Sequence, residues 1–588
     1  AVDMASTLTV AGVLTGASLD ISGDIDIDGT ANLDIVDVDG AVNFAADVTF
    51  ADGADLITAS AGTSNFRAGV NAGNSIESGG NYNTVVGDEA GTALTTGDNN
   101  VAVGHTAGDA MTTASENTAV GSKSLSGVTT GNSNTGVGAF AGLSITTGTN
   151  NVAVGPYALT TMTTSDYNTA VGRAAGRYIT TGFDNTLIGG LAGDALTDAD
   201  YNTAIGKEAL TSDTLGSRST AVGWSALANQ NFTSATNSYN TAMGFQAGLS
   251  VTTGTTNTLI GGLSGDAITT ASSNTAVGYS SLGVNTTGAF NTAIGYASLD
   301  ANTTADNNTA VGYNSLGLNT TGTRNTGLGN NTLQANTTAN NNTALGYNAM
   351  ALNTTGASNT AIGKDALDAN TTASNNVAVG YASLEANTTG TTNVAVGANS
   401  LDANTTANNN TAVGYDSLGA NTTGSENTAL GRGSLLVNTT GGNNTAVGVN
   451  ALDANTTASN NTAVGKDALT ANTTGTNNVA VGKDALDSNT TGSNNTALGV
   501  DTLQANTTAS DSTALGHGAL AVSTGASNTA VGKFALVANT TGNANVAVGN
   551  VALDANTSGE RNVALGAEAL GSNTTASANS AVGYKALF

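Results

Sequence analysis

The sequence predicts an all-β protein, a parallel β-solenoid (β-roll) of about thirty 17-residue coils, assembled as a trimeric fibre with an N-terminal β-prism-like stalk. Three observations support this prediction. Asn recurs every seventeen residues at the start of phrases such as "NTAVG". Each phrase joins two short β-prone stretches through Gly and Asn turns. Helix formers are few in a phrase, whereas Gly and β-branched Thr recur in each one.

The repeat keeps its register from Asn83 to Phe588, over thirty phrases. Two phrases differ in length: the one that begins at Ser219 is four residues longer, and the one that begins at Ser512 is one residue shorter. If each phrase is one coil that stacks about 4.8 Å from the last, thirty coils give a rod of roughly 140 Å.

Positions within a phrase, numbered from its first residue, have distinct roles. Position six accepts Pro156, Trp224 and Lys207 alike, so we expect it to face solvent. Later phrases have Leu at nine and Asn at twelve, and several early phrases have Gly at nine and an apolar residue at twelve. Two positions that exchange volume in this way share one cavity, so both are expected to border the interior or a subunit seam. The early pairs are Gly91 and Leu94, Gly108 and Met111, Gly142 and Ile145, Gly176 and Ile179, Gly193 and Leu196, and Gly265 and Ile268.

The chain divides into three segments by sequence. Residues 1–65 alternate acidic and apolar residues, as half-buried strands do, and are expected to form β-rich stalk repeats. Residues 66–82 are interpreted as a Gly-rich transition that caps the first coil, and residues 83–588 as the solenoid, with an insertion within 219–240. Because the first residue, Ala1, lies inside a stalk repeat, we expect the chain to be processed or truncated, with more stalk before it.

Charge and composition exclude several classes of function. The net charge is −28, from 14 basic and 42 acidic residues, and this surface would repel the phosphates of a nucleic acid. No apolar run approaches the ~20 residues that cross a bilayer, so membrane insertion is not expected. The sequence has no Cys and therefore neither disulfides nor thiolate metal sites.

A single roll is expected to be too weak alone. Ordering the backbone of one coil costs more free energy than its three modest apolar side chains return on burial. Three rolls that share their apolar edges would offset this difference, so we predict a homotrimer.

The stalk contains the one motif that matches part of a metal site. Asp24, Asp26, Asp28 and the following Gly match the opening of a calcium loop, but Ile35 stands where the closing Glu is required. We interpret these residues as a solvated acidic strand face. No cofactor is expected, with calcium at the stalk as the alternative left open.

The insertion contains the weak candidates for a ligand-binding site. Trp224, Phe232 and Tyr239 fall in or beside it, and aromatic side chains on a rigid scaffold stack well on sugars. A packed bulge is the alternative and the favoured interpretation.

No catalytic arrangement is apparent, so an enzyme is not expected. The two histidines, His105 and His517, are many coils apart, and paired carboxylates of the glycan-cleaving kind have no evident groove. The recurring Asn-Thr-Thr at positions twelve to fourteen is a glycosylation acceptor, as at Asn404. We favour a stacked Asn ladder that faces inward.

Phrases such as 308–324 resemble the "NTAxGYxALxxNTTGxx" repeats of phage tail-fibre proteins, and the stalk resembles stalks of marine phage fibres. More distantly, "NTAVG" is similar to the "NSVAIG" strands of trimeric autotransporter adhesin heads, although adhesin coils are shorter. Many such fibres end in a self-cleaving chaperone, which does not follow the last coil here. We expect that cleavage has removed it or that the sequence is part of a longer chain.

The resemblance implies an extracellular structural protein, a phage tail fibre or other virion appendage for host attachment. Its expected partners are two further copies of itself and a host cell-surface glycan or protein receptor. The alternative is a bacterial trimeric surface adhesin or extracellular filament subunit, and glycan cleavage remains a small third option.

Overall fold

The computed structural model describes residues 61–588, and this part of the chain is all-β with no helix. Most of the stalk predicted for residues 1–65 lies outside the described residues, as do the three stalk carboxylates Asp24, Asp26 and Asp28. The coils form one compact unit.

The described strands are short, and all but two of them form a single 31-stranded sheet. The exceptions, β10 and β12, pair with each other beside the insertion. The strands are β1 (Phe66–Ala68), β2 (Thr84–Val86), β3 (Val101–Val103), β4 (Thr118–Val120), β5 (Thr135–Val137), β6 (Val152–Val154), β7 (Thr169–Val171), β8 (Thr186–Ile188), β9 (Thr203–Ile205), β10 (Gly216–Ser217), β11 (Thr220–Val222), β12 (Thr236–Asn237), β13 (Thr241–Met243), β14 (Thr258–Ile260), β15 (Thr275–Val277), β16 (Thr292–Ile294), β17 (Thr309–Val311), β18 (Thr326–Leu328), β19 (Thr343–Leu345), β20 (Thr360–Ile362), β21 (Val377–Val379), β22 (Val394–Val396), β23 (Thr411–Val413), β24 (Thr428–Leu430), β25 (Thr445–Val447), β26 (Thr462–Val464), β27 (Val479–Val481), β28 (Thr496–Leu498), β29 (Thr513–Leu515), β30 (Thr529–Val531), β31 (Val546–Val548), β32 (Val563–Leu565) and β33 (Ser580–Val582).

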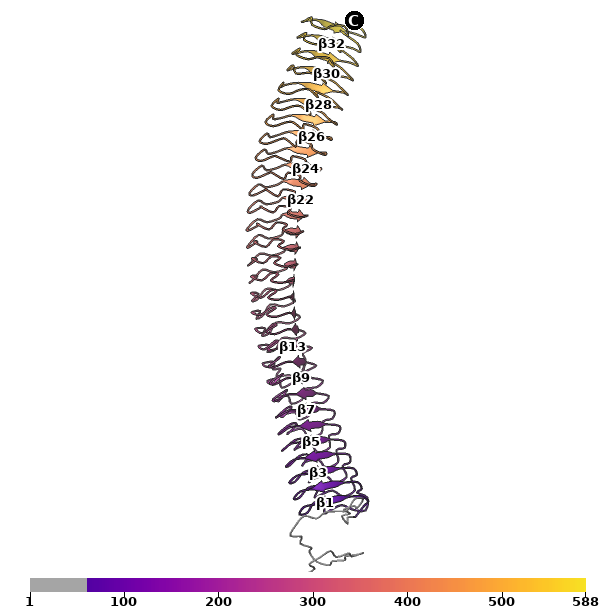
Figure 1. Cartoon of the computed structure of the whole chain (residues 1–588), viewed down its shortest axis with the longest axis vertical. Coiled ribbons are helices and arrows are strands. Elements are labelled where there is room, and N and C mark those ends of the chain that lie inside the picture. Colours follow the sequence, from indigo (N-terminus) through magenta and orange to yellow (C-terminus); the bar gives the residue numbers. More distant parts are fainter. Residues whose placement is uncertain (1–60) are drawn as a thin grey trace, which may run out of the picture. The chain divides into compact units, whose positions relative to one another are not determined.

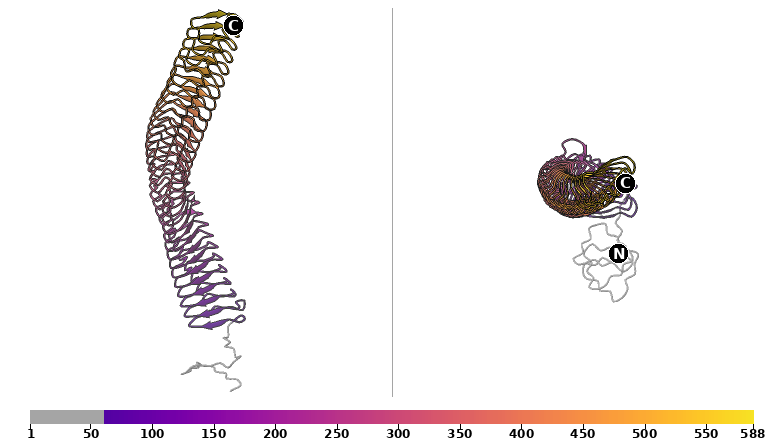
Figure 2. Two further views of the ribbon diagram at one scale, coloured as in Figure 1. Left: turned by 45° about the horizontal axis from the view of Figure 1, so that its top comes forward. Right: turned by 90° about the horizontal axis from the view of Figure 1, so that it is seen from above.

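Each strand of the large sheet pairs in parallel with the strand of the next coil, and equivalent positions lie opposite each other. In β17 and β18, Thr309 lies opposite Thr326 and Val311 opposite Leu328. Seventeen residues therefore complete one circuit and return the chain one strand further along the stack (Figure 1), and seen from above the circuits lie over one another (Figure 2). The prediction of a parallel β-solenoid of about thirty coils is confirmed.

The strand at positions two to four alternates between the two sides of the sheet. In β17, Ala310 is buried inside the coil, while Thr309 and Val311 face outward and are partly exposed. In this coil the interior beside Ala310 is filled by Leu316 at position nine, which is also fully buried. Three coils with Gly at position nine accommodate a larger inward residue instead, namely Val85, Leu187 or Leu259.

Glycine at position five turns the chain away from the strand. Gly312 has a φ of +133°, a conformation that residues with a Cβ rarely adopt. A Cβ built there would overlap the carbonyl oxygen of Gly329 in the next coil. Every coil of the large sheet has Gly at this position, which follows from both constraints.

Positions nine and twelve both line the interior of the single roll, as one of the two predicted alternatives requires. Leu316 at nine and Asn319 at twelve are fully buried. In an early coil, Met111 at twelve is also fully buried, and a Cβ at Gly108 would lie 2.8 Å from the Met111 Cε. The apolar side chain that moves between the two positions therefore fills one shared space.

Two ladders of buried Asn side chains run through the interior. At position one, the Asn308 Nδ2 donates to the Gly322 carbonyl oxygen at 2.9 Å, and the Asn308 Oδ1 accepts from the backbone N–H of Asn325 at 2.9 Å. At position twelve, the Asn319 Nδ2 donates to the same Gly322 oxygen at 2.9 Å and to the Asn302 Oδ1 at 3.2 Å. In the later coils, which have Asn at position twelve, the two ladders therefore close the coil at position fifteen and link it to its neighbours.

The solenoid begins before Asn83. The Asn65 Oδ1 accepts from the Asn83 backbone N–H at 2.8 Å, as in the position-one ladder, and β1 pairs in register with β2. The segment 66–82, which the sequence presents as a Gly-rich transition, therefore folds as a coil of the same kind.

Candidate functional site

Because the coils stack in register, a residue type that recurs at one position forms a column along the solenoid. Four outward or irregular features are candidates for function in the described part of the chain. They are the outer face of the sheet, a column of tyrosines, a column of carboxylates and a buried polar network at the insertion.

The first feature, which we call the sheet face, comprises the outward side chains at positions two and four of the 31-stranded sheet. Position two is mostly Thr or Val, and position four is mostly Val, Ile or Leu. Large apolar side chains at position four are partly exposed, with 44% exposure for Leu328, 46% for Met243 and 47% for Leu430. This face is uncharged although the chain as a whole is acidic: its position-four column is apolar, and its position-two column is mostly Thr.

The second feature, the tyrosine column, lies at position six, which the sequence predicts to be exposed. Tyr279, Tyr296 and Tyr313 of three successive coils stack with ring centroids 5.6 and 5.5 Å apart. Further along, the Lys364 Nζ lies 5.9 Å from the Tyr347 ring and 5.1 Å from the Tyr381 ring. These side chains are about half exposed, so ring edges and hydroxyl groups are available to a partner.

The third feature, the acidic column, lies at position ten, on the part of the coil that follows the turn after the strand. Its carboxyl groups are partly buried between coils, and burial is the main cause that raises their pKa above the ordinary value. A raised pKa applies to Asp194, Asp266, Asp368, Asp402, Asp453, Asp487 and Asp554.

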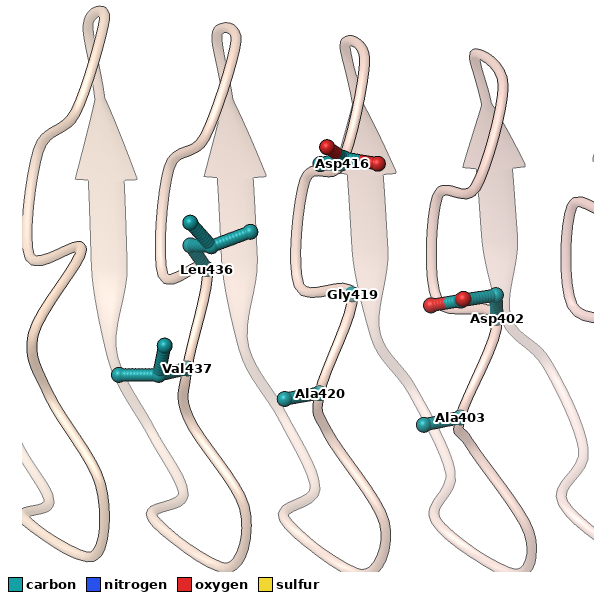
Figure 3. Close-up of a pocket in the computed structure, with 7 residues that line it drawn as sticks. All are labelled: Asp402, Ala403, Asp416, Gly419, Ala420, Leu436 and Val437. Atoms are coloured by element: carbon teal, nitrogen blue, oxygen red, sulfur yellow. The ribbon is translucent and has the colours of Figure 1, made fainter.

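A shallow depression of about 390 Å³ interrupts the acidic column (Figure 3). Its floor is low because Gly419 and Ala420 stand where the next coil has Leu436 and Val437. The Asp402 carboxyl group lies at its edge, so the chemistry of the depression is acidic and aliphatic. It would suit a group that combines a positive charge with an apolar stem.

The fourth feature is a buried network at the insertion, where Asp213 stands at a position-twelve site. The Asp213 carboxylate accepts from the Gln230 Nε2 at 2.6 Å and from the backbone N–H groups of Gly216 and Phe232, each at 3.1 Å. Burial raises the pKa of Asp213, and these hydrogen bonds only partly oppose the effect.

The same network replaces the position-one ladder at this point. Ser219 lacks the reach of Asn, and its Oγ instead meets the Ser238 Oγ at 2.6 Å and accepts from the Gln230 Nε2 at 2.7 Å. The Asn240 Nδ2 donates to the Gln230 Oε1 at 2.8 Å, which returns the chain to the regular ladder. The network therefore accommodates four extra residues without an unpaired buried group.

The three aromatic candidates from the sequence occupy different environments. Phe232 is buried at 5% exposure beneath the insertion, whereas Tyr239 is 55% exposed. Trp224, at position six, packs against Phe245 of the next coil with ring centroids 5.0 Å apart. Within residues 61–588, no ring contact joins the three. Phe232 thus packs as part of the bulge, and Trp224 belongs to the position-six column.

The remaining candidates from the sequence are the two histidines and the glycosylation acceptors such as Asn404. His105 and His517 are exposed at position six of distant coils. No group of three or more His, Cys, Asp or Glu that could hold a metal ion occurs between residues 61 and 588. The Asn404 side chain is buried in the position-twelve ladder, where its Nδ2 donates to the Asn387 Oδ1 at 2.9 Å. The acceptor side chain therefore points into the solenoid.

Sequence reasoning missed three of these features. The apolar sheet face is visible in the sequence as uncharged positions two and four, but only the pairing shows that both face outward. The acidic column is visible as Asp or Glu directly after position nine, which is Gly in the coils of Asp194 and Asp266 and Leu in later coils. The buried network at the insertion is marked in the sequence only by Ser219, which replaces Asn at position one. Ser512 makes the same replacement in the other coil whose length changes.

Comparison with protein-family models and with curated proteins gives no match for this chain. In the part of the chain that the structure describes, no helix is long and apolar enough to cross a membrane.

Proposed function

We propose that this chain forms the shaft of a trimeric attachment fibre, a phage tail fibre or similar virion appendage. The observation that supports this best is the 31-stranded parallel sheet, in which every coil repeats the same strand pairing with its neighbours. At about 4.8 Å per coil, such a stack spans roughly 140 Å.

The interior supports a role as a spacer. Each coil contacts only its neighbours, so the stiffness of the stack depends on the coil-to-coil hydrogen bonds. The strands, the two Asn ladders and the Thr side chains at position thirteen all supply such bonds. For example, the Thr320 Oγ1 donates to the Thr337 carbonyl oxygen at 3.0 Å. A shaft of this kind keeps a receptor-binding region at a fixed distance from the particle.

The outer surface supports an extracellular target rather than a nucleic acid. Its acidity disfavours phosphate-rich partners, whereas the tyrosine column offers rings of the kind that contact sugars or apolar side chains. The proposed partner is therefore a host cell-surface glycan or protein receptor.

A bacterial surface adhesin is the second candidate. The similarity of the "NTAVG" phrases to the "NSVAIG" strands of trimeric autotransporter adhesin heads favours it, and in this chain these phrases form the strands of the parallel sheet. The two candidates differ in where the protein is found.

Immunogold electron microscopy tests both candidates. Antibodies raised against the purified full chain are expected to label the tails of virions from the source culture and to block adsorption to the host, while antibodies against a head protein do not block it. Label confined to the surface of uninfected cells would contradict a virion fibre and support the adhesin. Label confined to the interior of uninfected cells would contradict both.

A further inference from the structure

The sheet face excludes charge over its whole length. In all 31 strands of the large sheet, positions two and four are uncharged, although the chain has 42 acidic and 14 basic residues. Position four bears Val, Ile, Leu or Met in every coil after the first, where Ala68 stands. If solubility were the only requirement at positions two and four, charged residues such as Lys, Asp or Glu would occur there, as they do at positions six and ten.

The sheet face is a long uncharged band, with a continuous apolar column at position four and mostly Thr at position two. Three residues at about 3.3 Å each, over a stack of roughly 140 Å, give a band of roughly 1,400 Å². Soluble monomers rarely expose contiguous apolar patches of more than a few hundred Å². A specific interface needs about 800 Å² from each partner, which this band supplies.

We propose that copies of this chain associate with one another along the sheet face. The proposal deepens the trimeric fibre proposed above by naming its seam. Positions nine and twelve, the seam that the sequence left open, are already filled inside each roll, so the interior offers no edge to share.

Two observations favour a further copy over a different partner. A long partner matches every coil only if it has the same rise of about 4.8 Å, and another copy has it by construction. Each copy also has a net charge of −28. Contact through the sheet face keeps the acidic columns away from the interface and limits the repulsion between copies.

The orientation of the strands adds a geometric consequence. In Figure 1 the arrows of β3–β9 and those of β22–β28 point to opposite sides, so the sheet face winds around the stack. Copies that remain in contact along this face therefore wrap around one another.

The test measures the mass of the full chain by light scattering after size-exclusion chromatography. The wild-type chain is expected at three times 57.0 kDa. The triple variant Val311→Glu, Val379→Glu, Val447→Glu places three like charges on the sheet face and is expected to fall threefold in mass, to that of one chain. Because these side chains are partly exposed in the single roll, its far-ultraviolet circular dichroism should match the wild type.

The matched control adds the same charge to the same coils at exposed position fourteen, as Thr321→Glu, Thr389→Glu, Thr457→Glu. It is expected to keep the wild-type mass. A wild-type chain that remains at 57.0 kDa, or two triple variants that dissociate equally, would overturn the proposal.

Cysteine cross-linking keeps the test decisive if the glutamate variant misfolds. The chain has no Cys, so Val379→Cys is expected to give interchain cross-links with a short bis-maleimide, whereas Thr389→Cys gives none. Equal cross-linking at both sites would overturn the proposal. A mass of two chains with this pattern would support the sheet face and contradict only the threefold fibre. A trimer whose mass does not change in the sheet-face variants would overturn the sheet-face seam and support only the threefold fibre.

Discussion

Replacement of one Asn in the position-one ladder, Asn376→Ala, should open the solenoid locally. The Asn376 Oδ1 accepts from the Asn393 backbone N–H at 2.9 Å, and its Nδ2 donates to the Gly390 carbonyl oxygen at 2.9 Å. All three residues are buried. The Gly390 oxygen keeps a second donor, the Asn387 Nδ2 at 3.0 Å, but the Asn393 N–H loses its partner.

The expected loss of local stability follows from these two changes in hydrogen bonding. A buried donor left without a partner costs about 1–3 kcal/mol, and a lost hydrogen bond whose acceptor stays satisfied costs about 1 kcal/mol. Together these give about 3 kcal/mol of local stability. Since every 1.4 kcal/mol is a factor of ten in an equilibrium constant, local opening should become about 100-fold more frequent.

Hydrogen exchange followed by mass spectrometry measures this opening on the full chain. Peptides that cover residues 376–393 should exchange about 100-fold faster in Asn376→Ala, and peptides several coils away should not change. The control Thr389→Ala alters an exposed side chain in the same coil and should change exchange less than threefold. Equal exchange in the two variants would refute the claim that the Asn ladder stabilises the stack.

Three further outcomes are expected. Gly312→Ala should lower local stability by about 3 kcal/mol or more, because Gly312 has a positive φ and the added Cβ would overlap the next coil. The control Gly190→Ala, at position six with no atom near the added Cβ, should be tolerated. Similar thermal melts for the two variants would contradict this prediction. Burial raises the pKa of Asp213, so the stability that it contributes is full below the unfolded-state pKa near 3.8 and is lost as pH rises through the folded value. Exchange near the insertion, corrected for intrinsic rates, should therefore slow in the wild-type chain as pH falls from 7, and Asp213→Asn should lose this pH dependence; the same dependence in both chains would refute the role of ionisation. Addition of a divalent-metal chelator should leave exchange across residues 61–588 unchanged, since no metal-binding group occurs in this range; faster exchange would reveal a site.

The sequence was sufficient to predict the solenoid because its constraints repeat in every coil. Gly at five stands in every coil of the sheet, and Asn at one stands in every phrase except those that begin at Ser219 and Ser512, so the seventeen-residue period identifies the circuit. The exchange of volume between Gly108–Met111 and later pairs with Leu at nine indicated a shared space at the interior or a subunit seam, and burial in the single roll identifies it as the interior.

The outward features were less predictable because they depend on which neighbours share a surface. The residues Val311 and Leu328 were recognisable as strand residues. Whether such side chains line the core or the outer face depends on the turn at Gly312, whose conformation the repeat pattern does not specify. The aromatic candidates at the insertion were chosen from proximity in sequence, with a packed bulge as the favoured interpretation, and the structure buries Phe232 while Tyr239 stays exposed.

High-resolution electron cryomicroscopy of the purified full chain tests the central claim most directly. The claim is that each seventeen-residue phrase is one circuit, with equivalent Asn residues stacked over one another. The map should show a parallel sheet with a rise of about 4.8 Å per coil and continuous side-chain density along the position-one Asn column. Helical density, or equivalent Asn residues that do not align along the axis, would contradict it.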